Sequence, residues 1–177
     1  DEAFMDFIKE GSKFSLVSEL DKYPNLFIIR SMTKFFAIPG LRLGFGLGNS
    51  EIITGLENNR DPWTVNTLAQ IAGIEALKQK DYIKKTKREN LKERNFLFSK
   101  LKEINKIKVF EPIANFILLK LKNELKTSDL KNRMAERGVL IRDCSNFRGL
   151  DQSYFRLAVK SRKINLKMLE ILRDSLK

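Results

Sequence analysis

One block of sequence gathers residue types that can perform covalent chemistry on a carbonyl group. Lys34 follows the short apolar run Leu26–Ile29, which is typical of a buried strand, and it is surrounded by Phe35, Phe36 and Ile38. A lysine held at a strand exit by apolar side chains is poorly solvated, which favours the neutral amine over the ammonium. The sequence therefore predicts a nucleophilic lysine suited to Schiff-base chemistry.

Two further residues of the block suit a phosphate group. Ser31 precedes Lys34 by three residues and offers a hydroxyl, whereas Arg42 follows it by eight residues and carries a fixed positive charge. A guanidinium and a hydroxyl beside a lysine amine fit a phosphate dianion. The ordinary alternative is a basic loop between two strands that binds no ligand.

The whole block, Ser31 to Phe45, resembles the signature of the class I and II aminotransferases and their decarboxylase relatives, which are fold-type-I pyridoxal-phosphate enzymes. The resemblance lies in the pattern Ser-x-x-Lys that ends at Lys34 and in Pro-Gly-Leu-Arg-Leu-Gly around Arg42. It implies that Lys34 binds pyridoxal 5'-phosphate as an imine. It also implies that Ser31 and Arg42 hold the phosphate of this cofactor.

The first four residues, Asp1 to Phe4, resemble the same family's Asp-x-Ala-Tyr/Phe element, which lies upstream of the lysine. By this resemblance Asp1 faces the pyridine nitrogen of the cofactor, where a carboxylate keeps the nitrogen protonated and lets the ring accept electrons. Phe4 departs from the tyrosine that many aminotransferases use beside the cofactor's 3-oxygen, so that hydrogen bond is missing or comes from another residue. The alternative for Asp1 is the arbitrary first residue of a fragment.

Residues near the other end of the chain are candidates for substrate binding. A strand-like segment around Arg156 resembles the family strand whose arginine holds the α-carboxylate of the substrate through two hydrogen bonds. The run Val139–Leu150 resembles the decarboxylase branch of the family, and Arg142 in it is a candidate for binding a substrate phosphate. Ser145 and Asn146 would then shape the pocket. The alternatives are a surface arginine at 156 and a strand-end arginine before a turn at 142.

The amino-acid composition of the chain excludes some classes of function. The chain has no His and one cysteine, Cys144, so it predicts no zinc or other metal site and no internal disulfide, and we expect Cys144 to be a packing residue. The net charge of +12 and the pI near 9.8 leave open a basic nucleic-acid-binding module, a function of another class. However, the basic residues between Lys78 and Arg94 alternate with acids, which is typical of a solvated helix face, so we expect no nucleic-acid partner.

The chain shows no signal peptide and no apolar run of about 18 residues. We therefore expect a cytoplasmic protein that has no membrane partner.

The order of elements predicts an α/β fold, with the C-terminal part of a large pyridoxal-phosphate-binding domain and a small α+β sandwich domain joined by a long helix. We expect the large-domain remnant at 1–85 and the small domain at 86–177, with Ser128 as an N-cap and Gly138 as a helix stop. The predicted strands are Leu26–Ile29, Gly44–Gly48, Ile107–Phe110, Asn115–Leu121, Val139–Arg142 and Tyr154–Val159. The predicted helices are Thr67–Leu77, Asp81–Ile104, Ser128–Glu136 and Ile164–Leu176.

Two branches of the family handle phosphorylated substrates: the histidinol-phosphate aminotransferases and the threonine-phosphate decarboxylases of cobalamin biosynthesis. The lysine block and the run Val139–Leu150 resemble the decarboxylase branch more. The resemblance therefore implies pyridoxal-phosphate-dependent decarboxylation of L-threonine O-3-phosphate to an aminopropanol phosphate, with histidinol-phosphate aminotransferase as the alternative. Relatives carry a long N-terminal half, so we expect this chain by itself to be inactive and the full-length enzyme to be a homodimer.

Overall fold

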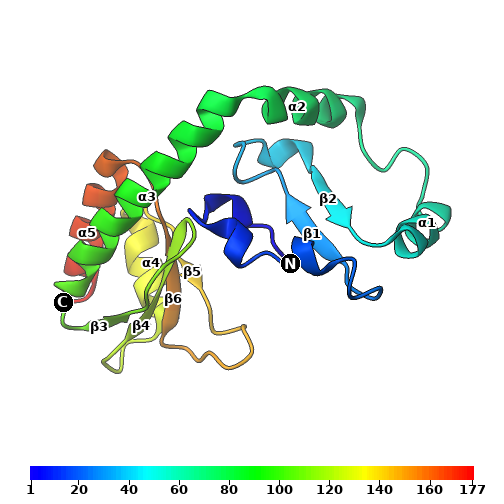
Figure 1. Ribbon diagram of the computed structural model, residues 1–177. Helices are drawn as coiled ribbons and strands as arrows, with labels where there is room; N and C mark the ends of the chain where they lie inside the picture. The colour runs from blue at the N-terminus through cyan, green and yellow to red at the C-terminus, as the bar shows by residue number, and fades with distance from the viewer. The chain divides into compact units, whose positions relative to one another are not determined.

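The computed structural model describes residues 1–177, which form two compact units, Asp1–Lys87 and Arg88–Lys177. Helix α3, Lys80–Lys102, begins in the first unit and ends in the second (Figure 1). The predicted long helix is therefore present. None of the helices combines the length and the apolar character that crossing a membrane requires.

The first unit contains a small antiparallel sheet. Strand β1, Ile28–Ser31, pairs with β2, Gly44–Leu47, and Ser31 lies directly opposite Gly44. Four short 3-10 turns accompany the two strands: Met5–Phe7, Gly11–Lys13, Val17–Glu19 and Pro39–Leu41. The strand pair brings the two ends of the lysine block side by side.

Two helices follow the sheet in the first unit, α1 (Ser50–Asn58) and α2 (Thr67–Lys78). Each begins after an asparagine, Asn49 or Asn66, whose side chain accepts a hydrogen bond of 2.9 Å from the amide three residues further on. Helix α2 was predicted, whereas α1 was not. None of the residues of α1 is buried, so it lacks the buried apolar stripe on which a sequence prediction depends.

The second unit is a four-stranded antiparallel sheet with helices. The order of the strands is β3-β4-β6-β5. The strands are β3 (Ile107–Val109), β4 (Phe116–Leu121), β5 (Arg142–Asp143) and β6 (Tyr154–Ala158). Two helices lie wholly in this unit, α4 (Thr127–Glu136) and α5 (Arg162–Ser175).

One face of this sheet forms the core of the second unit. Alternate residues of β4 are buried, namely Ile117, Leu119 and Leu121, and so are Phe155 and Leu157 of β6. They form one cluster with buried side chains from α3, α4 and α5, and each contributes about 1.5–3 kcal/mol by leaving water. The residues between them in sequence lie on the other face, which carries the candidate substrate anchor of β6.

Two local predictions in the second unit were wrong at their edges. The strand predicted at Val139–Arg142 begins only at Arg142, the first residue of β5. Val139 belongs to the end of the helix instead, because its amide donates to the Met134 carbonyl at 2.9 Å. Gly138, with a φ of 77°, is confirmed as the residue that stops α4. Ser128 is not the N-cap, because α4 begins one residue earlier, after Lys126.

Candidate functional site

The segment from 32 to 43, here called the lysine loop, connects β1 to β2 and carries the candidate lysine. The Met32 amide donates to the Leu43 carbonyl at 3.2 Å, which closes the loop directly beyond the last strand pair. At Gly44 a Cβ atom would lie only 2.7 Å from the Arg30 carbonyl oxygen. A glycine is therefore required where β2 passes beside β1.

Where β1 meets the loop, two hydroxyls and an amine lie close together. The Ser31 and Thr33 side-chain oxygens are 2.8 Å apart, and Lys34 Nζ donates to Ser31 Oγ at 3.5 Å. Lys34 Nζ also lies 5.5 Å from the centre of the Phe4 ring. The structure thus brings together the lysine, the predicted serine and the N-terminal Asp-x-Ala-Phe segment, and it adds a threonine that sequence reasoning missed.

The prediction that apolar neighbours shield Lys34 is wrong for this chain, because the lysine side chain is exposed. Phe35 instead is buried against Phe7, Phe36 and Tyr82, with ring centres 5.1, 5.2 and 6.4 Å away. The Tyr82 hydroxyl donates to the Phe35 carbonyl at 2.9 Å. The aromatic residues therefore anchor the loop, and the lysine side chain remains exposed to solvent.

Arg42 lies at the far end of the loop in a left-handed conformation, with a φ of 55°. Its exposed guanidinium donates to the Pro39 carbonyl at 3.2 Å and makes no hydrogen bond to Ser31 or Lys34. Ala37 shares the same φ, and each such residue costs about 1 kcal/mol of backbone strain. Strain of this kind collects in segments that bind ligands.

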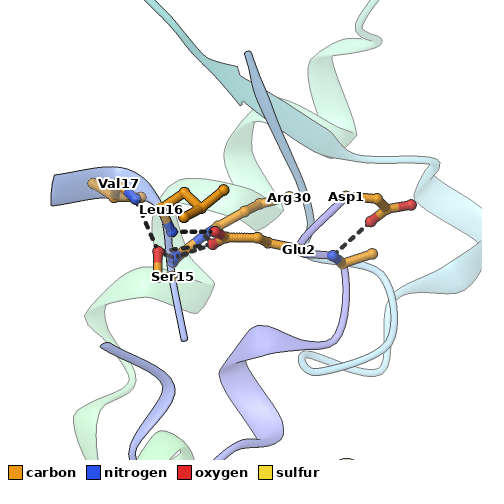
Figure 2. Close-up of polar contacts among 7 residues, drawn as sticks. Asp1, Glu2, Ser15, Leu16, Val17 and Arg30 are labelled. Atoms are coloured by element: carbon orange, nitrogen blue, oxygen red, sulfur yellow. Dashed lines mark hydrogen bonds and ion pairs between the residues drawn. The ribbon is translucent and has the colours of Figure 1, made fainter. Parts of the chain in front are cut away.

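Asp1 lies beside the strand that leads to the lysine loop. Its Oδ1 atom accepts a hydrogen bond of 2.8 Å from the Ala3 amide, and the carboxylate is exposed. The next residue, Glu2, donates its amide to the Ile29 carbonyl at 2.8 Å. Figure 2 shows the Asp1 and Glu2 side chains pointing in opposite directions. The backbone contact fixes Asp1 next to β1, although Asp1 itself forms no hydrogen bond to Ser31 or Lys34.

In the second unit, two of the predicted anchors are direct neighbours. Arg142 of β5 lies opposite Arg156 of β6. Phe155 and Leu157 are buried, so Arg156 lies on the other face of the sheet, together with Arg142. Neither guanidinium forms an ion pair with a carboxylate. Two like charges opposite each other destabilise a strand pair, and an anionic ligand would relieve this repulsion.

Each of these arginines is held by a neutral neighbour. Arg142 donates to the Asn146 side-chain oxygen at 3.0 Å, which leaves the amide NH2 of Asn146 as a donor, and its guanidinium carbon lies 5.5 Å from the Phe147 ring centre. The Arg156 guanidinium carbon lies 4.5 Å from the centre of the Phe116 ring. Together these side chains offer two guanidinium groups and one amide NH2 group, all of which are hydrogen-bond donors suited to carboxylate or phosphate oxygens.

Two other residues of this region have structural roles. Cys144 is buried, with 2% of its surface exposed, and this burial raises the pKa of its thiol, so it is a packing residue as predicted. The Ser145 amide donates to the Asp143 carboxylate at 2.9 Å and shapes the turn after β5.

A family model for class I and II aminotransferases matches residues 1–172. The chain belongs to the class I and II aminotransferase family. This membership confirms the family to which the block around Lys34 pointed.

Sequence similarity to individual relatives extends over nearly all of the chain. It is 42% identical over 174 residues to a Caldanaerobacter subterraneus subsp. tengcongensis protein provisionally named threonine-phosphate decarboxylase, a match that covers 98% of the chain and 47% of the relative. It is 36% identical over 176 residues to the histidinol-phosphate aminotransferase of that organism, covering 99% of the chain and 48% of the relative. The chain thus spans about half the length of these curated relatives.

A solved member of the aminotransferase family has the same fold. The crystal structure of the histidinol-phosphate aminotransferase from Clostridium acetobutylicum matches with a TM-score of 0.93 and 40% identity, over 99% of this chain and 53% of the other. This likeness confirms the predicted α/β fold class.

Proposed function

We propose that the full-length protein uses pyridoxal 5'-phosphate to decarboxylate L-threonine O-3-phosphate to an aminopropanol phosphate for cobalamin biosynthesis. Membership of the aminotransferase family supports the cofactor. The 42% identity to the Caldanaerobacter protein, against 36% to the aminotransferase of the same organism, supports the decarboxylase branch. Family membership also favours an enzyme over a basic nucleic-acid-binding module.

The donor set of the first unit fits the phosphate and the aldehyde of this cofactor. The Lys34 amine and the Arg42 guanidinium are exposed, and neither forms an ion pair with a carboxylate. The Ser31 hydroxyl lies beside the lysine amine. An unpaired amine is suited to react with an aldehyde, and a fixed cation with a hydroxyl is suited to a phosphate dianion.

These properties suggest a role for each residue toward the cofactor. Lys34 would bind it covalently, and Ser31 and Arg42 would hold its phosphate. Asp1, fixed beside β1, would keep the ring nitrogen protonated. When bound, pyridoxal phosphate accepts the electron pair released as a bond to the substrate Cα atom breaks.

The observation that carries the substrate proposal is the pair of arginines opposite each other on β5 and β6. L-Threonine O-3-phosphate has two anionic groups, a carboxylate and a phosphate, which match two guanidinium groups without acidic partners. Arg156 would hold the α-carboxylate, and Arg142 would hold the phosphate together with the amide NH2 of Asn146. Ser145 would shape the same pocket.

Two anchors also explain how the protein could select the reaction. An amino acid that is held at both its carboxylate and its phosphate has little freedom to rotate about its other bonds. Which bond to the substrate Cα atom breaks would depend on the orientation in which the two arginines hold the substrate. Arg142 and Arg156 would therefore decide between loss of the carboxylate and loss of the Cα hydrogen.

Histidinol-phosphate aminotransferase is the second candidate function. The Clostridium acetobutylicum structure, with a TM-score of 0.93 and 40% identity, favours it. Its phosphorylated substrate would use Arg142, and a dicarboxylic acceptor would use Arg156. The two candidates differ in their need for a keto acid, because a transaminase must regenerate its cofactor from the amine form and a decarboxylase returns the aldehyde form at each turnover.

This difference gives the test. Full-length protein loaded with pyridoxal phosphate is mixed with L-threonine O-3-phosphate in buffer without a keto acid, and the released carbon dioxide is measured over many turnovers. The decarboxylase proposal predicts continued release. The absence of release, together with glutamate formation when histidinol phosphate is the amine donor and 2-oxoglutarate is the acceptor, would contradict it and support the aminotransferase.

A further inference from the structure

A buried carboxylate lies directly next to the candidate ring-nitrogen partner. Glu2 is 8% exposed, and its Oε2 atom accepts hydrogen bonds from Arg30 Nε at 3.1 Å and from Arg30 Nη2 at 2.8 Å. Ser15 Oγ donates to the same oxygen at 2.9 Å, and the Leu16 amide donates to Oε1 at 2.9 Å (Figure 2). Both oxygens of this carboxylate therefore accept hydrogen bonds, three at Oε2 and one at Oε1.

The hydrogen bonds keep this pair charged. Burial raises the pKa of the Glu2 carboxyl, but the hydrogen bonds from the Leu16 amide, Arg30 and Ser15, together with the charge of Arg30, lower it more, so the pKa lies below its ordinary value. Arg30 is also largely buried, with 21% of its side chain exposed. An ion pair that is enclosed in this way resists screening by salt and holds its geometry.

The pair connects two segments that each lead to the candidate cofactor site. Asp1 comes directly before Glu2, and Ser31 comes directly after Arg30. Side chains of successive residues in extended chain point to opposite sides, and Figure 2 shows this for Asp1 and Glu2. The ion pair thus lies on one side of the two segments, and Asp1 and Ser31 point to the other side. The Glu2 amide, which donates to the Ile29 carbonyl at 2.8 Å, ties the same segments together.

We propose that Glu2 and Arg30 are positioning residues, which hold Asp1 at a fixed distance from Ser31 and Lys34 so that its carboxylate reaches the ring nitrogen of the cofactor while the others hold its phosphate and aldehyde. This inference rests on the proposed function. Asp1 has only one hydrogen bond, from the Ala3 amide, so its place depends on its neighbour. Glu2 and Arg30 would act through Asp1 without touching the cofactor.

The second unit offers a matched control for a purely structural role. Glu93, also 8% exposed, accepts hydrogen bonds of 3.0 and 3.1 Å from Arg162, and it has no connection in sequence to the candidate cofactor residues. Glu93→Gln and Glu2→Gln both replace a buried carboxylate by an amide of the same shape. Any general loss of stability should therefore be similar in the two variants.

The experiment compares full-length wild type, Glu2→Gln and Glu93→Gln. The dissociation constant of pyridoxal phosphate is measured by absorbance titration, and the protonation of its ring nitrogen is measured by NMR with 15N-labelled cofactor. Glu2→Gln should weaken binding by about tenfold and move the 15N signal toward the unprotonated form, whereas Glu93→Gln should leave both near their wild-type values. Equal values in Glu2→Gln and wild type, or equal changes in the two variants, would overturn the proposal.

One further variant keeps the test decisive. If Glu2→Gln does not fold, Ser15→Ala removes a single hydrogen bond to the same carboxylate, and it should weaken cofactor binding by about two- to fivefold. An unchanged dissociation constant in Ser15→Ala would then refute the inference. A wild-type protein that binds no cofactor at all would instead refute the proposed function, so the two failures are distinguishable.

Discussion

Replacing Arg156 by glutamine separates the binding role of this residue from its structural role. Arg156 lies opposite Arg142, and like charges directly opposite each other on a strand pair destabilise it by roughly 0.2–1 kcal/mol. The contact of Arg156 with the Phe116 ring at 4.5 Å offsets this by about 0.5–1 kcal/mol. Arg156→Gln should therefore change the free energy of unfolding by less than about 0.5 kcal/mol.

Substrate binding should respond far more strongly to the same change. Hydrogen bonds to a charged group contribute about 1.5–3 kcal/mol, so losing the guanidinium of Arg156 should weaken the binding of L-threonine O-3-phosphate roughly 10- to 150-fold. Calorimetric titration of the full-length protein measures the affinity, and thermal denaturation of the same samples measures the stability. Binding should fall while stability stays nearly constant.

Lys108→Gln is the matched control. Lys108 lies opposite Lys120, and its Nζ atom lies 5.0 Å from the centre of the Phe110 ring, so it combines the same like-charge pair with the same kind of aromatic contact. This variant should leave both stability and affinity near their wild-type values. An affinity of Arg156→Gln within twofold of wild type, or an equal loss in Lys108→Gln, would refute Arg156 as the carboxylate anchor.

Three further predictions concern the loop and the second unit. Arg42→Ala should weaken cofactor binding by about 1.5–3 kcal/mol, measured as the dissociation constant of pyridoxal phosphate, and an unchanged constant would remove Arg42 from the site. Tyr82→Phe removes the hydrogen bond to the Phe35 carbonyl and should lower the free energy of unfolding by about 1 kcal/mol, measured by denaturation. The hydrogen bonds from Arg162 hold the pKa of Glu93 below its ordinary 4.5, so this carboxylate contributes stability above pH 4.5 that is lost as the pH falls through the folded-state pKa. Thermal denaturation across this range should show a smaller loss in Glu93→Gln, and equal pH profiles would argue against the ion pair.

Local sequence patterns predicted the helix α2 but not what it buries. Its large apolar residues, including Leu68 and Ile74, are more than half exposed, whereas the small residues Ala69 and Gly73 are buried. A Cβ atom at Gly73 would lie 2.6 Å from the Leu43 side chain, so the helix approaches the lysine loop closely at this position. Periodicity alone assigns the large residues to the buried face, and it does not detect a contact that depends on the absence of a side chain.

Contacts among the candidate site residues were predictable from the sequence where the residues are close neighbours in the chain. Ser31 and Lys34 are in contact as expected, because a short turn connects them. The ion pair between Glu2 and Arg30 spans 28 residues, and no local pattern signals it. Similarly, the sequence singles out the arginines of β5 and β6 but not their position opposite each other, which depends on the register of the sheet.

The central claim is that Lys34 binds pyridoxal phosphate covalently, and borohydride reduction tests it most directly. Full-length protein is incubated with the cofactor, reduced, digested and mapped by mass spectrometry for the lysine that carries the cofactor. The exposed amine of Lys34, held 3.5 Å from Ser31 Oγ and without an acidic partner, predicts a single labelled peptide that contains Lys34 and loss of this label in Lys34→Ala. A label on another lysine of the wild-type protein, or no label at all, would contradict the claim.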